Sequence, residues 1–348
     1  MNEKRLCKSL DALMWFIDES FGIDRKDNNL NGFDFIVPLL ESAAYNSYLE
    51  NTSNKADTIH IRIKESLISM MENAYLSYVK RISDNISLSK KEVILAFDYT
   101  DEDFYGDVQG FDIHGWKRKD AVTGHFKFLT CSIISDEIPE KIPLISVPIK
   151  LGHRKSSVVK ECLFSIKDYV GEIKLILFDR GFYDNDLMYE LTKLKYPFLI
   201  FAKKLPEYKK FLEELEQGKT IVVHDYIVNK DKSNYEGENY LAFLKEIYDP
   251  RSEKNYDWIF ATNVEKIALG NLIGTYKKRW RIETQFRVQD EARIRCKSTE
   301  MKIRYFFFLF EQMLQTSWMC FYKDETSFKE FIIELAKMSR KWTKTQKD

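Results

Sequence analysis

Two short apolar runs, each followed directly by an aspartate, constrain the fold of this 348-residue chain. Residues 93–97 and 174–178 are almost continuously hydrophobic, and Asp98 and Asp179 follow them. Runs of this kind are typical of inner strands that are covered on both faces. We therefore expect a layered α/β domain in which two inner strands each end in a carboxylate.

The remaining strands and helices follow these runs in a fixed order. Strand-like runs lie at 93–97, 125–134 and 142–149, followed by a helix at 156–169, a strand at 174–178, a helix at 185–195 and a strand at 197–202. Three sequential strands suit an antiparallel meander, and helical crossovers then add strands in parallel. This order predicts an α/β fold with a ribonuclease-H-like mixed five-stranded sheet flanked by helices.

The regions outside this sheet predict three further parts. Apolar residues recur at helical spacing in residues 1–90, so a helical N-terminal domain is expected there, with DNA binding, dimerisation or structural capping as alternative roles. Three apolar runs separated by turn residues predict a β-rich insertion at 204–263. The catalytic domain would then comprise residues 91–203 and 264–322, and residues 323–348 would form a helical, polar C-terminal tail.

The composition excludes several classes of protein. A hydrophobic share of 44% with only 13 glycines and 7 prolines indicates a folded globular chain. No apolar run approaches the length of a membrane span, and the N-terminus has no apolar signal core, so we expect a cytoplasmic protein without a membrane partner. The five cysteines are widely spaced and predict reduced thiols. A net charge of zero argues against indiscriminate coating of nucleic acid.

One stretch, residues 276–304, is strongly basic, with ten basic and four acidic residues. Read as a helix, its first part places Tyr276, Arg279, Glu283, Arg287 and Asp290 on one face. A lone glutamate among arginines suits a metal ion held beside a phosphate backbone, and an ordinary solvated face with i,i+4 pairs is the alternative. The basic side chains expected to contact DNA here are Lys278, Arg281, Arg287, Arg293, Arg295 and Lys297.

The two strand-end aspartates gain meaning together with this glutamate. In open α/β sheets, ligands bind at the carboxyl edge of the strands, where Asp98 and Asp179 are expected. A third carboxylate, Glu283, on a helix packed across the sheet would complete a site for two divalent cations that act on a phosphodiester. A single strand-end aspartate is more often a turn or helix cap, so neither aspartate identifies the site alone.

These motifs resemble those of the DDE transposases of prokaryotic insertion sequences, in the branch with a β-rich insertion before the catalytic glutamate. Phe97-Asp98 resembles the first motif, residues 178–183 the second, and Tyr276-x2-Arg279-x3-Glu283 the third. The resemblance covers roughly residues 90–320. It implies that Asp98, Asp179 and Glu283 are catalytic ligands of two Mg²⁺ ions, with Mn²⁺ as a substitute, and that Tyr276 and Arg279 contact phosphates.

The activity implied is metal-dependent cleavage at transposon ends and strand transfer into target DNA, by two-metal hydrolysis and transesterification. The implied partners are transposon-end DNA, target DNA and a second copy of the chain in a synaptic homodimer, associated with a prokaryotic nucleoid. An aromatic residue of the insertion, Trp258, is a candidate for base stacking, although its place in an apolar run favours core packing.

One position departs from the family pattern. The lysine expected seven residues after Glu283 is replaced by Asp290, and Arg287, Arg293 and Lys297 are the candidates to supply the missing positive charge. Two alternatives to a transposase stay open: a ribonuclease-H-like nuclease without strand transfer, and a domesticated transposase derivative that binds DNA without catalysis. The presence of all three acidic residues weighs against the second alternative.

Overall fold

The structure, a computed structural model, describes residues 2–22, 32–119, 121–227, 238–250, 252–264 and 271–345. The N-terminal helices are α1 (Glu3–Phe21), α2 (Gly32–Tyr45), α3 (Ala56–Glu65) and α4 (Ile68–Asn85). The strands are β1 (Val93–Phe104), β2 (His114–Lys119), β3 (Val122–Ile133), β4 (Pro143–Ile149), β5 (Ile173–Phe178), β6 (Phe198–Phe201), β7 (Thr220–Ile227), β8 (Glu238–Asp249) and β9 (Lys254–Thr262). The later helices are α5 (Lys155–Ile166), α6 (Asn185–Lys193), α7 (Pro206–Glu214), α8 (Leu272–Lys277), α9 (Trp280–Gln289), α10 (Met301–Phe321) and α11 (Phe328–Thr345).

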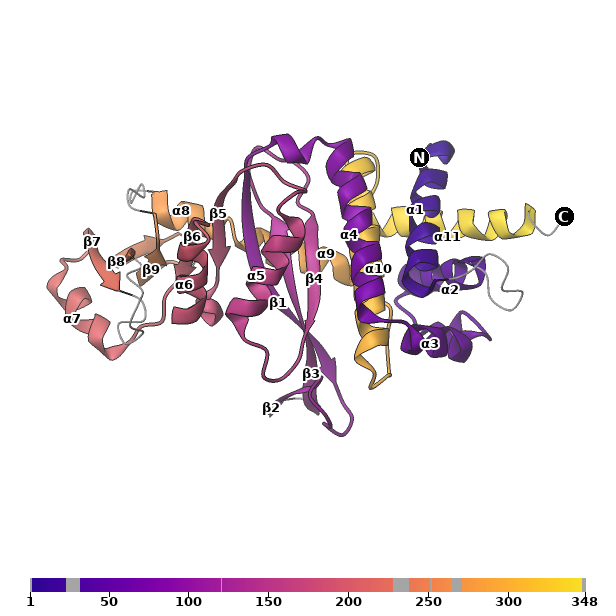
Figure 1. Cartoon of the computed structure of the whole chain (residues 1–348), viewed down its shortest axis with the longest axis horizontal. Helices are drawn as coiled ribbons and strands as arrows, with labels where there is room; N and C mark the ends of the chain where they lie inside the picture. The colour runs from indigo at the N-terminus through magenta and orange to yellow at the C-terminus, as the bar shows by residue number, and fades with distance from the viewer. Residues whose placement is uncertain are drawn as a thin grey trace.

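The sheet confirms the predicted order of its five main strands. Its path is β2-β3-β1-β5-β6-β9-β8-β7, and β4 pairs with β3 (Figure 1). Strands β1, β3 and β4 pair antiparallel, whereas β5 joins β1 and β6 joins β5 in parallel. The meander and the two parallel additions are therefore as expected for a ribonuclease-H-like sheet. Strand β2, which pairs with β3, lies between the predicted strands 93–97 and 125–134, where the sequence predicts no strand.

The insertion contains the predicted strands but continues the main sheet. Strand β9 pairs antiparallel with β6, and β8 and β7 follow outward from it. The reason is that β6 would otherwise be an edge strand, and its open hydrogen-bonding groups are taken by β9. Residues 228–237, inside the predicted insertion, lie outside the part of the chain that the structure describes.

Helix α10 is the central element of the core. Nearly all of its residues are buried, and it packs with α4 against β4, between the sheet and the other N-terminal helices (Figure 1). The Phe306 ring stacks on Phe16 with centroids 5.4 Å apart, and the Tyr78 hydroxyl donates to the Met313 carbonyl at 3.1 Å. The N-terminal helices and the sheet thus share one hydrophobic core.

Two helical regions have features that the sequence did not predict. The helical spacing over 57–82 suits a single helix, but the backbone becomes extended at Ser66 and divides this stretch into α3 and α4. The tail, expected to be helical and polar, contains α11, whose buried face packs on α2 because it carries Phe331, Ile332 and Leu335 at helical spacing. Within the described ranges, no helix is both long enough and apolar enough to cross a membrane.

Candidate active site

Asp98 and Asp179 lie side by side where two parallel strands part. The parallel pairing of β1 with β5 ends at Phe97 opposite Phe178, and their rings stack at 5.3 Å. Each aspartate is the next residue. The sequence predicts that Asp98 ends its strand, and this is wrong: β1 continues to Phe104, paired with β3, beyond the end of β5. Asp98 marks the end of the parallel ladder.

Glu283 lies on α9, which packs on the sheet beside β1. A tight turn joins α8 to α9, with the Arg279 amide donating to the Tyr276 carbonyl and the Ile282 amide to the Arg279 carbonyl. These hydrogen bonds join residues three apart, as in a 3-10 helix, and that geometry places the side chains of residues i and i+3 above one another. The Arg279 guanidinium accordingly lies 5.8 Å from the centre of the Tyr276 ring. Buried Ile282 fixes α9 on the sheet.

The Arg279 guanidinium joins two of the three predicted carboxylates. Its Nη1 donates to Asp98 Oδ2 at 2.7 Å, and its Nη2 donates to Glu283 Oε1 at 2.5 Å. Arg279 is 6% exposed, and its buried Nε has no hydrogen-bond partner. The backbone holds the carboxylates from the other side: the Tyr99 amide donates to Asp98 Oδ1, and the Gly181 amide to Asp179 Oδ1, both at 2.9 Å.

The electrostatics of Asp98 reflect the two other carboxylates. Burial raises the pKa of Asp98 to about 6, Arg279 opposes that rise, and the negative charges of Asp179 and Glu283 add to it. Burial also raises the pKa of Tyr276. The site therefore carries a concentration of negative charge that one guanidinium only partly neutralises.

This donor set suits a hard divalent cation such as Mg²⁺, which prefers carboxylate oxygens. In the arrangement that the described residues adopt here, no three Asp, Glu, His or Cys side chains form a group that could hold a metal ion. The Arg279 guanidinium instead bridges Asp98 and Glu283. The residues fit a cation on condition that Arg279 releases at least one of these carboxylates.

Two of the predicted DNA-contacting side chains hold α9 in place. Lys278 and Arg281 both form ion pairs with Asp136, which follows β3, and Arg281 also donates to the Ile134 carbonyl. These two cations lower the pKa of Asp136 to about 2. The sequence offered no signal for Asp136, since it lies about 140 residues before its partners.

The other basic residues divide into two groups. Arg287 is exposed on α9 and donates to Thr284 Oγ1 at 3.3 Å. Helix α9 ends at Gln289, and a short 3-10 turn over 290–292 leads into an extended segment. Arg293, Arg295 and Lys297 lie on that segment, off the helix.

Trp258 lies in an aromatic cluster under α8. It is 8% exposed, and its ring packs on Phe201, Phe260 and Tyr276 at centroid distances of 5.3 to 6.2 Å. Core packing accounts for this residue, because the ring faces are covered by protein.

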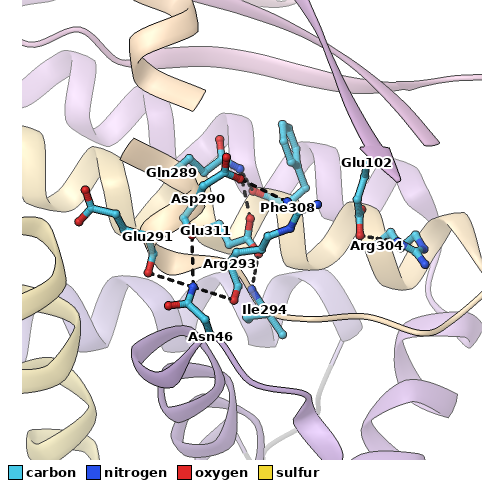
Figure 2. Close-up of polar contacts among 10 residues, drawn as sticks. All are labelled: Asn46, Glu102, Gln289, Asp290, Glu291, Arg293, Ile294, Arg304, Phe308 and Glu311. Carbon is cyan, nitrogen blue, oxygen red and sulfur yellow. Dashed lines mark hydrogen bonds and ion pairs between the residues drawn. The ribbon is translucent and has the colours of Figure 1, made fainter. Parts of the chain in front are cut away.

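Asp290, at the position where the family pattern has lysine, stands beside a cation. Arg293 Nη1 lies 3.6 Å from Asp290 Oδ1, whereas Lys297 Nζ lies 4.3 Å above the Tyr48 ring. Of the three candidates for the missing charge, Arg293 is therefore next to Asp290. Figure 2 shows Arg293 beside Asp290 at the end of the helix.

A cluster of polar side chains lies beneath this turn, and the sequence did not predict it. Glu102 on β1 pairs with Arg304 on α10, and Glu311 accepts from the Ile294 amide at 2.7 Å (Figure 2). Asn46 donates to the carbonyls of Asp290, Glu291 and Arg293, each at 3.2 Å. These residues lie far apart in sequence, so no local pattern could pair them.

Part of the chain matches a known protein family. Residues 154–310 match the family model described as the transposase DDE domain, a segment that includes Asp179 and Glu283 and begins after Asp98. The match covers less than half of the chain. No curated protein matches the chain by sequence.

Among solved structures, the chain is similar to piggyBac transposase in a cryo-EM structure of its synaptic complex with hairpin DNA. The TM-score is 0.60 at 12% sequence identity, over 97% of this chain and 79% of that chain. The fold is therefore the mixed α/β fold of ribonuclease-H-like transposases with additional N-terminal helices.

Proposed function

We propose that this protein is a DDE-type transposase that cleaves the ends of a DNA element and transfers them into target DNA. The observation that carries the proposal is that one buried guanidinium, Arg279, bridges Asp98 and Glu283, while Asp179 lies close enough for its charge to raise the pKa of Asp98. Supporting it are the family match over the segment with Asp179 and Glu283 and the transposase-type fold.

Each carboxylate has a distinct structural role in this proposal. Asp98 and Asp179 stand on the rigid sheet and would bind two Mg²⁺ ions, or Mn²⁺ in their place, with oxygens oriented by the Tyr99 and Gly181 amides. Glu283, whose side chain is 49% exposed, would bind from the helix. Bound divalent cations supply activation of the attacking oxygen and stabilisation of the leaving oxygen of a phosphodiester.

The basic residues are proposed to bind DNA in two ways. Exposed Arg287, Arg293, Arg295 and Lys297 would contact phosphates directly. Lys278 and Arg281 would act by fixing α9 through Asp136. We propose that Tyr276 and Arg279 reach phosphate only after Arg279 has left its carboxylate partners, since Tyr276 is 3% and Arg279 6% exposed.

The proposed partners are transposon-end DNA and target DNA, bound by a homodimer in a synaptic complex. The solved piggyBac structure is described as a synaptic complex with hairpin DNA, and its fold is similar over 97% of this chain. That likeness supports the same type of assembly for this protein.

The test is a cleavage and joining assay on DNA taken from both sides of the gene. With Mg²⁺ or Mn²⁺ we expect nicks at one discrete junction on each side and joining of the freed 3′ ends to a plasmid. Asp98→Asn, Asp179→Asn and Glu283→Gln should each reduce cleavage by at least about a thousandfold, because each removes a cation ligand. Asp324→Asn, on an exposed turn, is the matched control and should cleave normally.

The same assay decides between the alternatives. Nicking without joining of a pre-cleaved end would replace the proposal with a nuclease that lacks strand transfer. Tight DNA binding without any metal-dependent cleavage would indicate a domesticated DNA-binding derivative. Full cleavage by any one of the three acid-to-amide variants would remove that residue from the catalytic set.

A further inference from the structure

An open trough with a volume of about 660 Å³ lies beyond the catalytic edge of the sheet. The outer half of β1 forms one wall, and the extended segment 293–297 forms the other with Tyr48 from the N-terminal region. A smaller cavity of about 100 Å³, lined by Thr100 and Asp290, shares Glu102, Arg293 and Arg304 with the trough. The two hollows are therefore neighbours, and the smaller one begins at Thr100, two residues after Asp98.

The basic wall has a regular spacing. Arg293, Arg295 and Lys297 are exposed, and they alternate with Ile294, which is buried, and Cys296, which is half-buried. The Arg295 amide donates to the Ser47 carbonyl at 3.0 Å, which holds the segment extended against the N-terminal region. Alternate residues of an extended chain lie roughly 6.6 Å apart and point to the same side, so the three cations form one row.

The charge of the trough is positive because its acidic wall is largely neutralised. Glu102 pairs with Arg304, and both side chains are largely buried (Figure 2). Asp103 is the other acidic residue that lines the trough. Exposed Arg293, Arg295 and Lys297 therefore face exposed Asp103, and Arg293 also lies 3.6 Å from exposed Asp290. The small excess of positive charge that is left favours a polyanion.

Two tyrosines add aromatic surface to this charge. Tyr105 is 65% exposed where the trough opens, and Tyr48 is half-buried with the Lys297 ammonium 4.3 Å from its ring centre. A basic groove with accessible aromatic rings is typical of sites for unpaired nucleic acid, because every unstacked base offers a face to an aromatic ring. Bases inside a duplex are stacked on one another and offer no such face.

We propose that this trough binds an unpaired stretch of DNA strand that continues from the strand held at the catalytic carboxylates. Phosphates lie along Arg293, Arg295 and Lys297, and a base stacks on Tyr105. The N-terminal region takes part through Tyr48. That the strand continues from the carboxylates rests on the proposed function. That the ligand is unpaired DNA rests on the charge and the aromatic rings of the trough.

The test measures binding without metal, so that catalysis plays no part. Fluorescence anisotropy in EDTA would compare a blunt duplex with a duplex that carries an unpaired extension of about ten nucleotides. We expect the extended DNA to bind more tightly. Tyr105→Ala should weaken binding of the extended DNA by about 5- to 150-fold, the effect of one stacked base, and leave the blunt duplex unchanged.

Further variants separate charge from stacking. Arg295→Gln should reduce the slope of log affinity against log salt by about 0.7 for the extended DNA, which is one single-strand phosphate contact. Tyr256→Ala, at a 40% exposed tyrosine on β9, is the aromatic control and should bind as the unaltered protein does.

The outcomes distinguish this inference from the proposed function. Equal losses for blunt and extended DNA with Tyr105→Ala would overturn the inference in favour of a duplex site, and no loss with either would exclude the trough as a DNA site. Preference for the extended DNA in a protein that never cleaves would support the trough while refuting the transposase proposal. Cleavage at the element ends without that preference would do the reverse.

Discussion

Arg279 on the turn before α9 donates to Asp98 on β1 at 2.7 Å, across 181 residues of sequence. The same guanidinium reaches Glu283, so one buried cation connects the sheet to the helix. The contact keeps α9 in register with the strands and neutralises part of the charge that two divalent cations would neutralise in the proposed site.

The first prediction concerns this guanidinium. Arg279→Met should destabilise the protein in EDTA by about 3–5 kcal/mol, because it leaves Asp98 buried without its ion-pair partner. Mn²⁺ should restore more stability to this variant than to the unaltered protein, since the cation meets no competing guanidinium. Urea unfolding with and without Mn²⁺ is the measurement. Arg287→Met, at an exposed arginine of α9, is the control, and an equal response of both variants to Mn²⁺ would contradict the prediction.

The second prediction concerns the pH dependence of cleavage. Because the pKa of Asp98 is raised to about 6, its carboxylate takes up a proton below that pH and loses the ability to bind a cation. Cleavage should therefore fall as pH drops below about 6. Since cations and protons compete for the same oxygens, a higher Mg²⁺ concentration should move the midpoint to lower pH. A midpoint that ignores Mg²⁺ would show that another group controls the profile.

The third prediction concerns Glu311, which is buried beneath the turn after α9. Burial raises its pKa from 4.5 to about 8, so the folded protein keeps a proton that the unfolded chain releases. Stability is therefore lost as pH rises from about 4.5 to about 8, by at most about 1.4 kcal/mol per pH unit from this group. Glu102, buried nearby, also has a raised pKa and contributes in the same direction.

Glu311→Gln should remove the contribution of Glu311 while that of Glu102 stays. The free energy of unfolding, measured in urea at several pH values, should fall less steeply with pH in this variant than in the unaltered protein. Glu334→Gln, at a carboxylate that pairs with Lys337 on the surface, is the control. Parallel pH curves for Glu311→Gln and the unaltered protein would refute the raised pKa.

The fourth prediction concerns Asn46, which joins the N-terminal region to the end of the catalytic helix. Its φ of 48° lies in the left-handed region, and its amide donates to three carbonyls of residues 290–293. Asn46→Gly should lose only the side-chain contacts, which include the hydrogen bond that Asn46 Oδ1 accepts from Lys329 Nζ at 2.6 Å, at about 1.5–3 kcal/mol. Asn46→Ala should lose about 1–2 kcal/mol more, because a Cβ disfavours that backbone conformation. Equal stabilities of the two variants in thermal unfolding would argue against backbone strain at this position.

Much of the fold followed from local patterns. Apolar runs report strands covered on both faces, and their order along the chain was enough to predict the meander and the parallel additions. The same runs located Asp98 and Asp179, because a carboxylate after an inner strand is visible in the sequence alone. Helical spacing likewise placed Glu283 on the same face as Tyr276 and Arg279.

Other features depended on partners that are distant in sequence. The outer half of β1 reads as an acidic loop, but Arg304 neutralises Glu102 and Lys127 lies 3.6 Å from Asp101, so the strand continues. The insertion joins the main sheet because β6 offers a free edge to β9. No spacing rule predicts either arrangement.

The sequence by itself determined the strand order and the three carboxylates, since both arise from periodicity and from neighbours along the chain. The tertiary structure decided which cations those carboxylates meet. Arg279 pairs with Asp98, and Lys278 and Arg281 pair with Asp136. The trough is lined by three cations that lie beyond the end of α9: Arg293, Arg295 and Lys297. Charges act through space and over short distances, so only the folded chain determines their partners.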